Sequence, residues 1–101
     1  GSEDKTGLKM DGTTALRLKT MLRSNVKNSY GDSRFSGLEM CGKTGTAEVE
    51  GDKPHSWFAG FSSREDLPLA VIAVVENAGS GSGAAITAAN RVMQQLAKTF
   101  D

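Results

Sequence analysis

The sequence predicts an α+β fold, in which a three-stranded antiparallel sheet is flanked by an N-terminal and a C-terminal helix. Two stretches with apolar residues at helical spacing enclose three strand-like stretches. Only short runs of turn residues separate the strands, and such connections place neighbouring strands in antiparallel order. The expected order is helix, strand, strand, strand, helix, with both helices packed on the sheet.

The first helix is expected at about 13–28. Residues 1–12 are polar and contain glycine, which predicts a loop or a tag-derived terminus. Apolar residues then recur with helical periodicity, and the turn-forming sequence that starts at Asn28 ends the helix. The residues of this apolar stripe are Ala15, Leu18, Leu22 and Val26.

The strands are expected at about 38–49, 55–63 and 67–77. The first contains two glycines, which suggests close approach by another backbone or by a ligand. In the second, Trp57 and Phe61 share a face and are expected in the core, with Phe58 on the other face. The third strand hardly alternates in polarity, so we expect it to be covered on both faces.

The final helix is expected at about 83–99, after a loop rich in glycine and serine. Its apolar residues again follow helical spacing and form a broad stripe. They are Ala85, Ile86, Ala89, Val92, Met93, Leu96 and Phe100.

The overall composition excludes several classes of function. Twelve basic and twelve acidic residues cancel, so no field attracts the chain to nucleic acid or to an anionic membrane. A single cysteine, Cys41, rules out an internal disulfide, and we expect it to be a small buried hydrophobe. Because Cys41 and His55 are the only soft ligands, no metal or other cofactor is expected.

The motif Lys43-Thr44-Gly45-Thr46 is the informative part of the first strand. Alternation places the two threonine hydroxyls on one face, where both can bond a carboxylate. Lys43 adds a positive charge that attracts the carboxylate, and Gly45 leaves room for an extended ligand along the strand. The Thr46 N–H is positioned to stabilise an oxyanion. A second K-T-G, at 5–7, has no strand pattern around it, and we interpret it as accidental.

The wider pattern resembles the penicillin-binding proteins, which belong to the D,D-transpeptidase and serine β-lactamase-like superfamily. In that family a G-K-T-G-T-A strand precedes a W-F-A/V-G-F strand, an apolar strand and a glycine-rich loop before the C-terminal helix. Here these elements are Gly42 to Glu48, Trp57 to Phe61, Leu69 to Val75 and Gly79 to Gly83, so the resemblance extends over about residues 13–100.

The resemblance implies that 1–101 is the C-terminal part of a transpeptidase domain whose all-helical lobe lies elsewhere. Lys43 and Thr46 would be catalytic, and Lys43, Thr44, Gly45 and Thr46 would bind substrate. The implied ligands are peptidoglycan stem peptides that end in D-alanyl-D-alanine, and β-lactams. The implied location is extracytoplasmic, in a membrane-anchored parent at the bacterial cell surface or in the periplasm.

The family mechanism also needs an S-x-x-K nucleophile and an S-x-N motif. The chain contains no S-x-N. Two strings fit S-x-x-K, at residues 2–5 and at Ser24 to Lys27, but their positions do not match that of the family nucleophile. We therefore expect the nucleophile and the remainder of the domain in polypeptide outside this sequence, and the isolated chain to be inactive.

Other interpretations stay open from the residues alone. They are the β-lactam sensor domain of an antibiotic-responsive receptor, a serine β-lactamase fragment, and a non-catalytic α+β binding module with a coincidental motif. His55 is expected as a partly exposed strand residue, and Glu48 as a solvated residue beside the ligand face.

Overall fold

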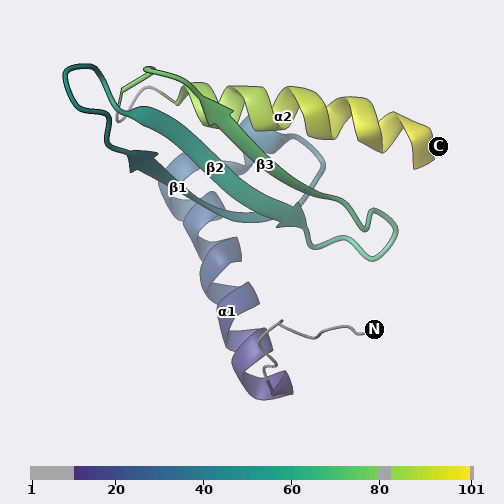
Figure 1. Cartoon of the computed structure of the whole chain (residues 1–101). Helices are drawn as coiled ribbons and strands as arrows, with labels where there is room; N and C mark the ends of the chain where they lie inside the picture. The colour runs from purple at the N-terminus through teal and green to yellow at the C-terminus, as the bar shows by residue number, and fades with distance from the viewer. Residues whose placement is uncertain (1–10, 80–82, 101) are drawn as a thin grey trace, which may run out of the picture.

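The computed structural model describes residues 11–79 and 83–100 and confirms the predicted order of elements (Figure 1). The helices and strands are α1 (Gly12–Asn25), β1 (Met40–Ala47), β2 (His55–Ser62), β3 (Ala70–Val75) and α2 (Ala84–Ala97). Three short turns of helix complete the structure: the π-helical η1 (Val26–Tyr30) and the 3-10 helices η2 (Asp32–Phe35) and η3 (Lys98–Phe100). The prediction that the first helix continues to about residue 28 corresponds to α1 followed directly by η1.

The sheet is antiparallel throughout, with β2 between β1 and β3. Phe58 at its centre lies opposite Thr44 of β1 and Ala73 of β3. Since residues directly opposite each other share a face, this register assigns every strand residue to one of two faces. We call the face that carries Phe58 the inner face, and the other the outer face.

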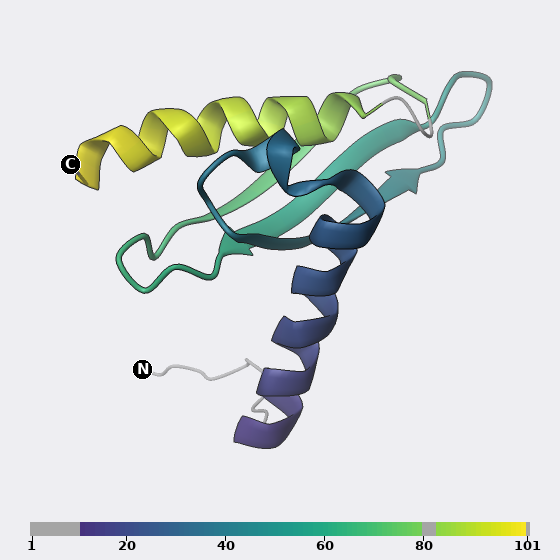
Figure 2. The ribbon, with the colours of Figure 1, turned by 180° about the vertical axis from the view of Figure 1, so that it is seen from behind.

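The hydrophobic core lies on the inner face, beneath α2 and the segment that joins α1 to β1 (Figure 2). Phe58 is fully buried, and its ring centroid lies 5.1 Å from that of Phe35. A Cβ atom at Gly42 would overlap the Phe58 ring. This glycine therefore makes room for an aromatic side chain of the neighbouring strand.

Along β2 and β3 the outer face is not part of the core, which corrects two expectations. Trp57 and Phe61 lie on this face and are only partly buried, while Ile72 and Val74 of β3 are 79% and 59% exposed. Within the described ranges, α2 and the η1–η2 segment both pack on the inner face (Figures 1 and 2). The predictions of a doubly covered third strand and of Trp57 and Phe61 as core residues are therefore wrong for this chain.

The two helices differ in their contact with the sheet. α2 lies along it and buries Ala85, Ile86, Ala89 and Met93, whereas α1 reaches it only at its C-terminal end (Figure 1). Asp11 caps α1 by accepting a 2.8 Å hydrogen bond from the Thr14 N–H, which lowers the pKa of the Asp11 carboxyl.

The apolar stripe of α1 is buried only near the sheet. Val26 is fully buried, but Leu18 is 42% exposed and Leu16 and Met21 are each 64% exposed. No helix in the described part of the chain is both long enough and apolar enough to cross a membrane.

Replacement of Phe58 by alanine should lower the free energy of unfolding by about 3–5 kcal/mol, because it opens a cavity at the centre of the core. Phe100→Ala is the matched control, since Phe100 is 47% exposed, and it should cost less than about 1 kcal/mol. Urea denaturation of the two variants measures the difference. Equal losses would show that the core is not centred on β2.

Candidate functional site

The first half of the free edge of β1 is occupied by side chains of this chain. In an antiparallel strand, alternate residues direct their backbone N–H and C=O groups to the same edge. The Met40 carbonyl accepts a hydrogen bond from Arg23 at 2.9 Å, and the Gly42 carbonyl accepts one from Asn25 at 3.3 Å. The Thr44 N–H donates to the Tyr30 hydroxyl at 3.0 Å. The same alternation directs the Thr46 N–H to this edge, beyond the three occupied positions.

Arg23 fixes α1 against both β1 and the following turn. Besides the Met40 carbonyl it bonds both carboxylate oxygens of Asp32, at 2.7 and 2.8 Å. This bidentate pair raises the pKa of Arg23 and lowers that of Asp32. The helix end that supplies Asn25 and leads to Tyr30 is thereby held in one position along the strand.

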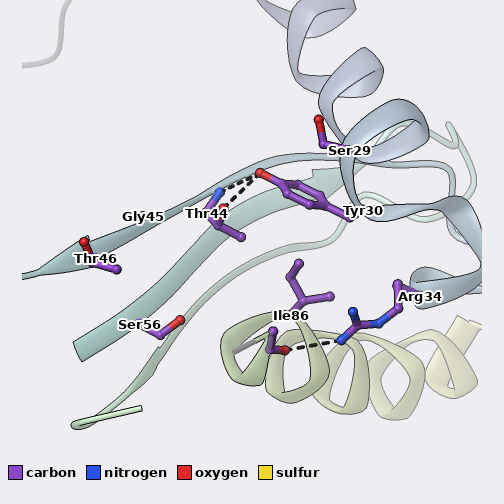
Figure 3. Close-up of a pocket in the computed structure, with 9 residues that line it drawn as sticks. Ser29, Tyr30, Arg34, Thr44, Gly45, Thr46, Ser56 and Ile86 are labelled. Carbon is purple, nitrogen blue, oxygen red and sulfur yellow. Dashed lines mark hydrogen bonds between the residues drawn. The ribbon is translucent and has the colours of Figure 1, made fainter. Parts of the chain in front are cut away.

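A cavity of about 390 Å³ lies beside β1 on the inner face (Figure 3). Its walls come from η1, η2, β1, β2 and the start of α2. Its surface combines hydroxyl groups, one guanidinium and apolar atoms. The lining residues are Ser29, Tyr30, Arg34, Thr44, Gly45, Thr46, Ser56, Gly83 and Ile86.

The structure brings three of the four predicted site residues to this cavity. Thr44 and Thr46 share the inner face, as the alternation predicts, and both line the cavity together with the backbone of Gly45. Lys43 does not line it. Its exposed side chain leaves β1 on the outer face, and its Nζ turns back to the Thr44 carbonyl oxygen at 3.3 Å.

The structure explains the glycine at position 45 by packing against a neighbouring strand, whereas the sequence alone suggests room for a ligand. A Cβ atom at this position would point to the outer face and overlap the indole of Trp57 on the neighbouring strand. The missing side chain therefore accommodates Trp57 and does not leave space for a ligand on that face. Only the backbone of Gly45 reaches the cavity.

Sequence reasoning missed Tyr30, Arg34 and Ser56, which also line the cavity. Arg34 donates to the Gly83 carbonyl at 3.3 Å and to the Thr87 hydroxyl at 2.9 Å, and so joins η2 to the start of α2. Tyr30 and Arg34 belong to a stretch that the sequence marks only as a turn. Its hydrophilic composition gives no signal for the side of the sheet on which it lies.

The remaining candidate residues have structural or solvated positions. His55 accepts a hydrogen bond at Nδ1 from the Asn77 N–H at 3.0 Å, and Glu48 is exposed just beyond β1. Cys41 is fully buried, which confirms it as a buried hydrophobe, and this burial raises the pKa of its thiol. Among the described residues, no group of three or more His, Cys, Asp or Glu side chains is arranged to hold a metal ion.

Ser24, the one S-x-x-K serine that the structure describes, is not among the residues that line the cavity of Thr44 and Thr46. It borders a different cavity, of about 370 Å³, together with Lys19, Arg23 and Lys27. Its hydroxyl accepts a hydrogen bond from the Asn28 amide at 2.9 Å. The other S-x-x-K match and the second K-T-G lie outside the described residues.

A family model described as the penicillin binding protein transpeptidase domain matches residues 2–98. The D,D-transpeptidase domain of a peptidoglycan glycosyltransferase from Eggerthella lenta is 34% identical, with a TM-score of 0.65 over 86% of this chain and 20% of that one. Pseudomonas aeruginosa PBP2, solved in complex with WCK 5153, is 29% identical, with a TM-score of 0.66 over 88% of this chain and 20% of that one. The chain thus spans about a fifth of the length of these structures. No curated protein matches it.

Replacement of Gly45 by alanine should displace the Trp57 indole and disturb the pairing of β1 with β2. We expect a loss of about 1–3 kcal/mol in the free energy of unfolding, as for other overpacked sites. Trp57 is the only tryptophan, so its fluorescence emission reports the displacement directly. Gly12→Ala is the control, because a Cβ atom there meets nothing within 4 Å. An unchanged emission spectrum in Gly45→Ala would contradict this packing role.

Proposed function

The chain belongs to the penicillin-binding protein transpeptidase family, and we propose that it supplies the strand of the active site that binds the carboxylate end of the substrate. The observation that carries this proposal is the placement of the Thr44 and Thr46 hydroxyls in one cavity beside the free edge of β1. Two hydroxyl donors on one face can bond the two oxygens of a carboxylate. The Lys43 ammonium, held at the Thr44 carbonyl, adds positive charge at the same edge.

The proposed substrate is a peptidoglycan stem peptide that ends in D-alanyl-D-alanine, and a β-lactam would occupy the same place. Such a ligand lies extended along β1 and adds to the sheet edge where it is open, next to Thr46. Its terminal carboxylate then reaches the hydroxyls of Thr44 and Thr46. The Thr46 N–H, directed to the same edge, is one donor to the oxyanion of the attacked carbonyl.

The covalent chemistry is proposed for the remainder of the domain. A serine hydroxyl gives its proton to a general base and its oxygen bonds to the ligand carbonyl carbon; the carbon–nitrogen bond then breaks, and the leaving nitrogen takes up that proton. The S-x-x-K serine and lysine and the S-x-N group belong to polypeptide outside this sequence. In this proposal, residues 1–101 form the C-terminal part of the domain, and this part supplies Lys43 and Thr46 for catalysis.

The family match supports a transpeptidase over the alternatives. Both the family model and the Eggerthella lenta structure are described as transpeptidase domains. The match over residues 2–98 also argues against a coincidental motif in an unrelated binding module.

The proposed location follows from peptidoglycan as substrate, which lies outside the cytoplasmic membrane. A sensor domain of a receptor would bind β-lactam but would not cross-link stem peptides, so turnover of a D-alanyl-D-alanine peptide by the parent protein separates the two.

The isolated 101-residue chain should form no covalent adduct with benzylpenicillin. The sequence has no S-x-N motif, and the serines among the described residues that line the Thr44–Thr46 cavity, Ser29 and Ser56, do not belong to an S-x-x-K string. Intact-mass spectrometry after incubation is the measurement, and the complete parent protein is the positive control. A stoichiometric adduct on Ser24 would show that the nucleophile has been misassigned.

In the complete protein, Thr44→Val and Lys43→Ala should each slow acylation by benzylpenicillin. A hydrogen bond to a charged group contributes about 1.5–3 kcal/mol, which corresponds to roughly ten- to a hundredfold in rate. Both penalties should shrink for the methyl ester of benzylpenicillin, because the ester has lost the charge that the strand binds. Acylation rates of the acid and the ester are compared for each variant. Equal slowing of the two compounds would refute carboxylate recognition by β1 even if the fold is correct.

A further inference from the structure

Tyr30 is the one cavity residue that bonds the backbone and the side chain of Thr44 at the same time (Figure 3). We propose that Tyr30 is a positioning residue, whose hydroxyl orients the Thr44 O–H toward the carboxylate of the ligand. This inference rests on the proposed function of the site, and it adds a residue that lies outside the K-T-G-T motif.

The position of the Tyr30 ring is set by its packing and by the turn that carries it. The ring meets Phe58 edge-on, with 6.4 Å between the centroids and 76° between the planes. The turn ends at Gly31, whose N–H bonds the Val26 carbonyl at 2.7 Å and whose φ of 93° favours glycine. These constraints place the Tyr30 hydroxyl 3.0 Å from both the N and the Oγ1 of Thr44.

The allocation of protons at this contact follows from the groups present. The Thr44 N–H can only donate, so the Tyr30 oxygen accepts from it. Two arrangements then remain for the pair of hydroxyls. If Thr44 donates to Tyr30, then Thr44 presents only lone pairs to the cavity. If Tyr30 donates to Thr44, the Thr44 proton is free for a ligand.

A carboxylate selects the second arrangement, because an ionised carboxylate only accepts hydrogen bonds. The result is a continuous chain: Thr44 N–H to the Tyr30 oxygen, Tyr30 O–H to Thr44 Oγ1, and Thr44 O–H to the carboxylate. Each donor in such a chain polarises the next, which strengthens the last bond. Without the Tyr30 hydroxyl, the Thr44 hydroxyl is free to rotate. The backbone N–H of Thr44 at the strand edge also loses its acceptor.

The substitution Tyr30→Phe isolates this role, since phenylalanine keeps the ring against Phe58 and removes only the hydroxyl. In the complete protein we expect acylation by benzylpenicillin to slow about three- to tenfold, the range of one neutral hydrogen bond. Acylation by the methyl ester should slow by less than about twofold, since the ester offers a weaker acceptor. In a Thr44→Val background, Tyr30→Phe should have almost no further effect on the acid, because the two residues act through one hydroxyl.

Thr20→Val is the matched control for loss of a hydroxyl. Thr20 bonds the Leu16 carbonyl at 2.9 Å on the exposed surface of α1, and its replacement should leave both rates unchanged. Equal slowing of acid and ester by Tyr30→Phe, or full additivity with Thr44→Val, would show a purely structural role and overturn the inference. If the unmodified parent formed no adduct with either compound, the proposed function itself would be wrong, and this inference would fall with it.

Discussion

The hydrogen bonds along the free edge of β1 determine which part of this edge stays open for pairing with another chain. An unpaired strand edge exposes N–H and C=O groups that any extended chain can bond. Arg23, Asn25 and Tyr30 occupy this edge as far as Thr44, and the ion pair of Arg23 with Asp32 holds the helix end from which they come. In the proposed function, pairing with a ligand is therefore confined to the part of the strand around Thr46, which borders the cavity together with Thr44 and Gly45.

The alternation of side chains in β1 separates two tasks within one motif. Thr44 and Thr46 face inward to the cavity, while Lys43 and Gly45 face outward. The outward positions serve the sheet as well as the site, since Gly45 accommodates Trp57. The Lys43 side chain starts on the outer face and bends back to the strand edge, where its Nζ reaches the Thr44 carbonyl. The motif thus combines the packing role of Gly45 with the recognition proposed for Thr44 and Thr46.

The sequence predicted those features that depend on local periodicity. The order of elements, the antiparallel pairing and the common face of Thr44 and Thr46 all follow from spacing along the chain. Tyr30 was not predicted, because its role depends on a turn that packs against a strand fourteen residues away. The prediction of which face of β2 is buried in the core was also wrong. Trp57 and Phe61 on one face outweighed Phe58 in the pattern, whereas the position of α2 decides which face is buried.

Apolar side chains of the described residues are exposed both on the sheet and on α1. Ile72 and Val74 on the outer face, and Leu16 and Met21 on α1, expose apolar area that a separately folded domain would bury. The solved relatives are about five times as long as the segment that this chain matches, so most of their domain has no counterpart here. On the sheet itself this apolar exposure is concentrated along β3, because the outer face is fully buried at Cys41 and partly buried at Trp57 and Phe61.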